Sequence, residues 1–146
     1  MLNVIADFFA SIKWDFVKDQ ENSIIHTEYQ SNNNSWRCYA QWRDQQQQLV
    51  FYSIAPIAVP QDRRTAVAIY ETRINYGLVL GNFELDLSDG EIRYKTSIDI
   101  TGSQLTPTLI KQIVMTNVTM MEKYLPSLQK VIQGVDPNDP QSNLEI

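Results

Sequence analysis

The sequence feature that most constrains the fold is an alternation of apolar and polar side chains between Ser35 and Arg43. Every second side chain in this run is apolar, namely Trp36, Cys38, Ala40 and Trp42. The side chains between them are polar or amphipathic, namely Arg37, Tyr39, Gln41 and Arg43. Because successive side chains of a strand point to opposite faces of a sheet, this pattern predicts a strand with one core face and one other face.

Two further runs predict strands beside this one. The run Ile24–Gln30 alternates in the same way, and Leu49–Ile54 is rich in residues that suit a pleated sheet. The asparagine-rich stretch 31–34 and the polar stretch 44–48 are typical of the turns between such strands. We expect Pro56 and Pro60 to end this strand region, since proline cannot donate a ladder hydrogen bond.

A second hairpin is predicted further along the chain. Its strands are Leu78–Leu87 and Glu91–Ile100, and the Asp89-Gly90 pair between them can take the positive φ angles of a tight turn.

Three segments carry apolar side chains at helical spacing. The first runs from Met1 to about Lys13. The second begins at Pro60 or Gln61 and ends at Gly77, where a left-handed C-cap is expected. Its inner face is expected to carry Ala66, Ile69, Tyr70, Arg73 and Ile74. The third begins at Thr106-Pro107 and ends at Gly134, and Pro126 predicts a kink or a restart near Tyr124.

The element order predicts an α+β fold. It reads α-β-β-β-α-β-β-α, with an antiparallel sheet of about five strands and helices packed on it. We expect a single domain over residues 1–134 and a disordered tail over residues 135–146, which has two prolines and no periodicity.

Composition excludes several classes of function. The net charge is −5, with 12 basic residues scattered along the chain, so we expect no binding to nucleic acid. No apolar stretch suits a membrane span or a signal peptide, and we expect no membrane association. The single cysteine, Cys38, cannot form an intramolecular disulfide, which fits a cytoplasmic protein.

No catalytic motif is present. His26 and Cys38 lie on neighbouring strands, but the alternation places Cys38 among core tryptophans as an inert thiol. The acidic side chains of the second hairpin are expected to form a solvated charged face, with Arg93 and Lys95 pairing across it with Glu84 and Asp86. We therefore expect no enzymatic activity, no catalytic residues, no cofactor and no metal site.

The candidate partner-binding residues are those opposite the core face of the central strands. Aromatic residues are enriched at interfaces, and helices can cover only one face of such a sheet. The candidates are Arg37, Tyr39, Gln41, Arg43 and Tyr52.

Several short runs of the chain resemble one known family. They are Val59-Pro60, Arg63 or Arg64, Asn75-Tyr76-Gly77-Leu78, Gly81-Asn82-Phe83-Glu84-Leu85-Asp86, Asp89-Gly90-Glu91-Ile92-Arg93-Tyr94-Lys95 and Leu105-Thr106. They resemble the YbjN-like bacterial family, over roughly Leu2 to Gly134, and the element order is similar to the type III secretion chaperone-like fold. The resemblance implies an intracellular bacterial protein without established enzymatic activity, and it implies a tendency to form homodimers.

Three functions stay open at this point. The leading hypothesis is a non-enzymatic, chaperone-like or regulatory module that binds an unidentified protein partner, as a homodimer. The second is a small-molecule sensor with its ligand in a cleft between sheet and helix. The third is an enzyme that uses the acidic hairpin, in which Glu84 and Asp86 would carry the chemistry.

Overall fold

The structure, a computed structural model, describes all 146 residues and contains one antiparallel sheet. Its six strands lie in the order β1-β2-β3-β4-β6-β5. They are β1 (Phe16–Asp19), β2 (Ile24–Gln30), β3 (Ser35–Arg43), β4 (Gln48–Ala58), β5 (Asn82–Leu85) and β6 (Glu91–Asp99). The predicted α+β class is confirmed, with the order α-β-β-β-β-α-β-β-α and one strand more than the sequence predicts.

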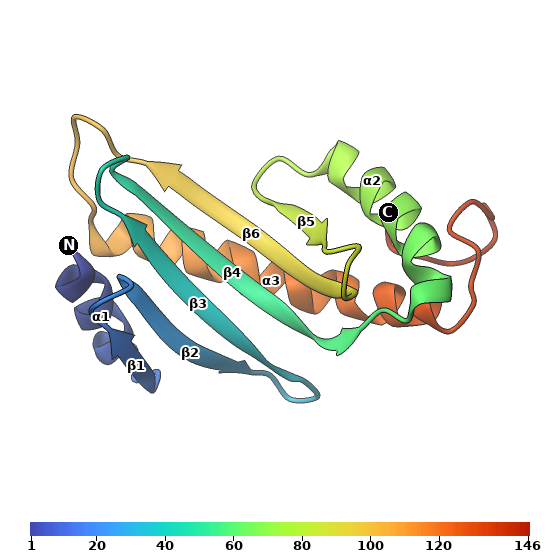
Figure 1. The fold of residues 1–146 in the computed structure, drawn as a ribbon, viewed down its shortest axis with the longest axis horizontal. Coiled ribbons are helices and arrows are strands. Elements are labelled where there is room, and N and C mark those ends of the chain that lie inside the picture. Colours follow the sequence, from blue (N-terminus) through green and yellow to red (C-terminus); the bar gives the residue numbers. More distant parts are fainter.

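Helices cover one face of this sheet and leave the other open. They are α1 (Leu2–Ser11), α2 (Arg64–Gly77), which follows the short 3-10 turn η1 (Gln61–Arg63), and α3 (Pro107–Ile132). Figure 1 shows α3 running behind the central strands, with α1 beside it and β3 and β4 uncovered in front. No helix is long and apolar enough to cross a membrane.

The alternation in β3 is confirmed by burial. Its apolar side chains are all buried against the helical layer, while Arg37 and Arg43 are exposed. The facing stripe of α3 supplies the other half of the core, with Ile110, Val114, Val118, Met121, Leu125, Leu128 and Val131 buried. Apolar burial on this scale is the main force that holds a sheet and a helix together.

Strand β1 is absent from the sequence prediction. It pairs antiparallel with β2, with Phe16 opposite Thr27 and Asp19 opposite Ile24. The strand has four residues, and Val17 in it is largely exposed. A short edge strand buries too little to impose a periodic pattern, so the sequence carries no local signal for it.

Strand β4 continues beyond the point where the sequence predicts its end. The expectation that Pro56 terminates the strand is wrong, because β4 runs through it to Ala58. The register with β6 shifts between Ile54 and Ala58, which marks a β-bulge. Three β4 residues, 55–57, lie between the pairs that Ile54 and Ala58 form, against one residue of β6, and a proline is tolerated there because it has no ladder partner.

The second hairpin is shorter than predicted on its first side. β5 spans Asn82–Leu85 rather than Leu78–Leu87, while β6 agrees closely with its prediction. Gly90 in the turn has φ +82°, as expected, and a Cβ there would lie 2.1 Å from the carbonyl oxygen of Val59. Only glycine fits this close approach of the turn to the end of β4.

The inner face of α2 is rotated from the predicted one. Tyr70 and Ile74 are buried as expected, but Ile69 and Arg73 are exposed, and Val67 and Glu71 take their place. The predicted left-handed C-cap at Gly77 is also wrong, since Gly77 does not have a positive φ and Leu78 after it is extended.

The start of α3 is confirmed. The Oγ1 of Thr106 accepts a hydrogen bond from the Leu109 backbone nitrogen at 3.2 Å, and Pro107 follows it. The helix continues through Pro126 without a restart, so that part of the prediction is wrong. Gly134 follows the end of the helix with φ +121°.

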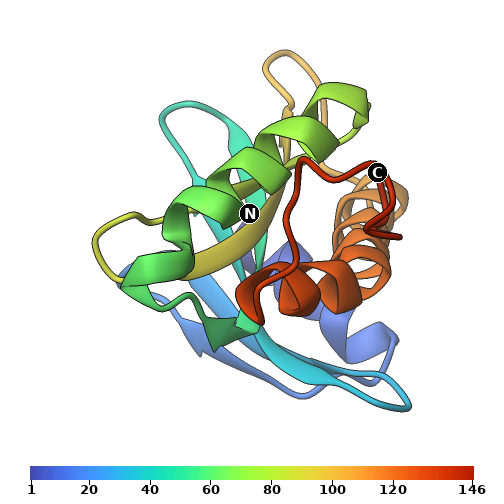
Figure 2. The same ribbon diagram turned by 90° about the vertical axis from the view of Figure 1, so that its right-hand side faces the viewer.

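Residues 135–146, for which the sequence predicts a disordered tail, lie against α2 and α3 (Figure 2). The Tyr70 hydroxyl donates to the Glu145 carbonyl at 2.5 Å, and the Glu145 nitrogen donates to Ser127 Oγ at 2.8 Å. Leu144 packs on the core. These are long-range contacts of single residues, which leave no periodicity in the sequence.

Candidate functional site

The open face of the sheet carries all five residues that the sequence singles out. Tyr39 pairs with Tyr52 across β3 and β4, and Gln41 pairs with Val50. Arg37 and Arg43 are exposed at the two ends of β3, and Tyr39, Gln41 and Tyr52 are half-buried. The structure thus brings the five side chains onto one face of the sheet. Figure 1 shows that no helix covers this face at β3 and β4.

A continuous row of side chains crosses this face from β2 to β5. The ring of His26 lies 6.4 Å from that of Tyr39, and the rings of Tyr39 and Tyr52 are 4.7 Å apart. The Arg93 guanidinium carbon lies 4.3 Å from the centre of the Tyr52 ring, and its Nη1 donates to the Tyr39 hydroxyl at 3.4 Å. We call this set the open-face row: His26, Tyr39, Tyr52, Arg93, Lys95 and Glu84.

An ion-pair cluster anchors the far end of the open-face row. Arg93 Nε donates to Glu84 Oε1 at 2.8 Å, and Lys95 Nζ donates to Glu84 Oε2 at 3.0 Å. Burial acts to raise the pKa of Glu84, but the hydrogen bond from Lys95 and the charge of Arg93 outweigh it and lower that pKa. Glu84 therefore stays ionised and holds both cations in place.

The tyrosine next to this cluster stays neutral. Burial raises the pKa of Tyr39 above its usual value, against the opposing charge of Arg93. A neutral phenol can both donate and accept a hydrogen bond, and its ring keeps a flat apolar surface. The open-face row therefore combines apolar rings and fixed cations with hydroxyl groups that can donate or accept a hydrogen bond.

Of the six residues in the open-face row, the sequence names only Tyr39 and Tyr52 as partner-binding candidates. It predicted Arg93 and Lys95 to pair with Glu84 and Asp86, whereas both cations bind Glu84. Asp86 instead accepts hydrogen bonds from the backbone and side chain of Ser88. The link from Arg93 to the tyrosines depends on the β4–β6 register, which joins segments on either side of α2 and leaves no local signal.

His26 and Cys38, which could act as a base and a nucleophile only if they met, do not meet. His26 pairs with Tyr39 on the open face, while Cys38 pairs with Thr27 and points into the core. Cys38 is only 2% exposed, and burial raises the pKa of its thiol to about 11. A buried, protonated thiol is unreactive, as the sequence predicts.

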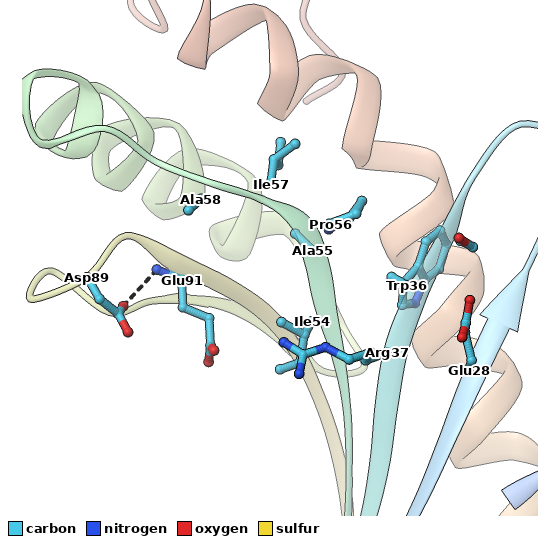
Figure 3. A pocket seen from close by; sticks show the side chains of 11 residues that line it. Glu28, Trp36, Arg37, Ile54, Ala55, Pro56, Ile57, Ala58, Asp89 and Glu91 are labelled. Carbon is cyan, nitrogen blue, oxygen red and sulfur yellow. Dashed lines mark hydrogen bonds between the residues drawn. The ribbon is translucent and has the colours of Figure 1, made fainter.

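Two of the cavities beside the sheet bear on function. One, of about 570 Å³, lies between β6 and α3, and its lining mixes the apolar Leu80, Ile98 and Ile113 with polar residues such as Thr96 and Gln112. The other, of about 510 Å³, lies where β3 and β4 separate, beside Arg37 (Figure 3). No three histidine, cysteine or acidic side chains are gathered in a way that could hold a metal ion.

A family model matches residues 2–130 of the chain. Its description is "Putative bacterial sensory transduction regulator", and the family is YbjN. The sequence matches no curated protein.

Solved structures similar to this one share its fold at low sequence identity. YbjN from E. coli has a TM-score of 0.65 at 11% identity, over 91% of this chain and 90% of its own. The ExsC–ExsE complex has a chain with a TM-score of 0.57 at 13% identity, over 87% and 92%. The Yersinia pestis type III secretion chaperone SycH, in complex with a fragment of YscM2, has a TM-score of 0.50 at 11% identity, over 81% and 93%. The fold is thus type III secretion chaperone-like.

Proposed function

The chain belongs to the YbjN family, and from that premise we propose that it is a non-enzymatic module that binds a protein partner in a regulatory or chaperone-like role. The observation that carries the proposal is the open-face row on an uncovered sheet. The similar structures of SycH and ExsC, each in a complex with another protein, support a protein as the class of partner.

The chemistry of the open-face row suits a protein interface. Tyrosine and arginine are enriched among the residues that contribute most to binding energy. Tyr39, Tyr52 and Arg93 are already held by one another, so that a partner would lose little side-chain entropy in ordering them. Charged side chains at the ends of β3, Arg37 and Arg43, would form the polar rim of such an interface.

Two further parts belong to the proposal. We infer a cytoplasmic location, because a single buried thiol suits a reducing compartment. We also infer a homodimer, which the resemblance to secretion chaperones implies.

The test is affinity purification of the tagged protein from its native cells, followed by mass spectrometry. We expect a reproducible protein partner that is lost with Tyr39→Ala or Arg37→Ala. Tyr76→Ala is the matched control, because Tyr76 is 96% exposed and lies at the end of α2, away from the open-face row. Recovery of the protein alone, or equal loss with Tyr76→Ala, would contradict the proposal.

One observation favours a second candidate, a small-molecule sensor. The cavity between β6 and α3 is the kind of cleft between sheet and helix that this function needs, and about 300–1,000 Å³ is usual for ligand sites. A metabolite that binds there would raise the melting temperature of the wild type and not that of Ile113→Glu. The absence of any shift across a metabolite collection would argue against the sensor.

A further inference from the structure

The sheet is split between β3 and β4 over their last residues. The two strands are paired from Arg43–Gln48 to Cys38–Ser53, and no pair follows. Continued register would place Arg37 opposite Ile54 and Ser35 opposite Pro56. On this side, residues 35–37 of β3 and residues 54–58 of β4 have no neighbouring strand, although β3 remains paired with β2 as far as Ser35.

The cause of the split lies in β4. Pro56 has no N–H group to donate to β3, and the bulge between Ile54 and Ala58 bends the strand. The Gly90 turn holds this bent end in place, because the Val59 nitrogen donates to the Gly90 carbonyl at 2.9 Å. The two strand edges thus separate around a fixed opening, which we call the split cleft (Figure 3).

The split cleft has a volume of about 510 Å³ and walls of two kinds. Its lining includes the apolar β4 residues Ile54, Ala55 and Ile57. Its rim carries Glu28, Asp89 and Glu91 against one cation, Arg37, which reaches from β3 toward Ile54 in Figure 3. None of these four side chains takes part in the ion pairs of the structure.

We propose that the split cleft receives a short extended segment of a partner protein as an added strand, and that the segment carries lysine or arginine. Two facing strand edges with no partner offer backbone hydrogen bonds to such a segment on both sides, whereas an outer edge of a sheet offers them on one side only. Three acidic groups against one basic group select positive charge in the segment. The inference rests on the proposed protein-binding function and names the chemistry of its partner.

No segment of the chain itself fills the cleft. Residues 135–146 lie on α2 and α3. The β2–β3 hairpin next to the cleft is already paired within itself. A strand that enters the cleft therefore comes from another molecule.

The test uses the whole protein and a phage-displayed library of random octapeptides. We expect selection of peptides that are rich in lysine or arginine and β-branched residues and poor in proline. A selected peptide, made synthetically, should shift the indole N–H resonance of Trp36, which lines the cleft; Trp36→Phe assigns that resonance. Replacing its basic residues by glutamate, or methylating its backbone nitrogens, should weaken binding about tenfold or more.

Variants of the protein locate the site. Glu28→Gln with Glu91→Gln should weaken peptide binding about fivefold, and Glu21→Gln, an exposed acid in the β1–β2 turn, should not change it. Selection of no peptide, or of peptides that leave the Trp36 signal and the double variant unaffected, would overturn the inference. A Trp36 signal that shifts with protein concentration alone would also overturn it, because a second copy would then occupy the cleft.

The two proposals fail separately. Peptide binding is measured without the native partner. Failure to recover a native partner by affinity purification therefore does not affect the result of the peptide experiment. If purification recovers a partner through Tyr39 while no peptide enters the cleft, only the strand-addition inference is wrong.

Discussion

At the scale of single residues, Glu71 is a carboxyl group buried in the core without an ion-pair partner. It lies on the inner face of α2 and is 5% exposed, and its Oε1 has no hydrogen-bond partner. Burial, with a smaller contribution from the charge of Glu84, raises its pKa to about 8. The folded protein therefore favours a protonated carboxyl group at this position.

This raised pKa makes stability depend on pH. An unfolded chain releases the Glu71 proton near pH 4.5, while the folded protein retains it up to about pH 8. The folded state binds more protons between these values, so its free energy of unfolding should fall as the pH rises through this window, by a few kcal/mol. Chemical unfolding with urea at pH 5.5 and pH 8.5 measures the fall.

The matched variant is Glu71→Gln, which keeps the shape and removes the titration. We expect its stability to change less between the two pH values, and to exceed that of the wild type at the higher one by about 1 kcal/mol or more. Equal pH dependence in the two proteins would contradict this account of Glu71.

Single residues also show which features of the open face can be predicted from the sequence. Tyr39 could be assigned to the face opposite the core because its neighbours Cys38 and Ala40 alternate with it. The contact between Tyr39 and Arg93 could not be predicted from the sequence. The two residues are 54 positions apart and meet only because of the order of the strands in the sheet. Local alternation reveals which face a side chain lies on, and the fold decides what it touches.

At the scale of elements, Asn117 joins α3 to β4 and β6. It is fully buried, and its Nδ2 donates to the carbonyls of Phe51 and Tyr94 and to the hydroxyl of Thr96, at 2.9 to 3.1 Å. A polar side chain in an otherwise apolar helix face fixes how the helix lies on the sheet.

Removing this amide should be costly. Asn117→Ala leaves a cavity and takes a buried donor away from two carbonyls, so we expect the free energy of unfolding to fall by about 2–4 kcal/mol. Urea denaturation measures the fall, with Asn138→Ala, in the exposed tail, as the control. A loss within about 0.5 kcal/mol of the control would show that Asn117 does not hold the helix.

Elements were predictable where their own residues determine them. β2 and β3 match their predicted bounds because each buries alternate side chains. β1 and the far end of β4 were missed because pairing with a neighbour, and a bulge around Pro56, place them in the sheet. The split cleft, which depends on that bulge, was therefore beyond prediction from the sequence.

At the scale of the whole molecule, the proposed homodimer can be tested directly by the mass of the protein in solution. We expect light scattering to give twice the mass of the chain, 16.9 kDa, at micromolar concentrations. The apolar residues Tyr76, Val79 and Leu80, exposed together before β5, make Val79→Asp the first variant to examine for loss of that mass. A strict monomer at high concentration would contradict the dimer and leave the open-face row unaffected.

The central claim is that the open face of the sheet meets a protein partner. Its most direct test is photo-crosslinking in native cells, with a photoreactive phenylalanine analogue in place of Tyr39, Tyr52 or Tyr76. The account predicts one crosslinked partner of the same mass from positions 39 and 52 that is absent from position 76, where the only crosslink expected is to a second copy of the chain. No crosslink from the open face, or the same product from all three positions, would contradict it.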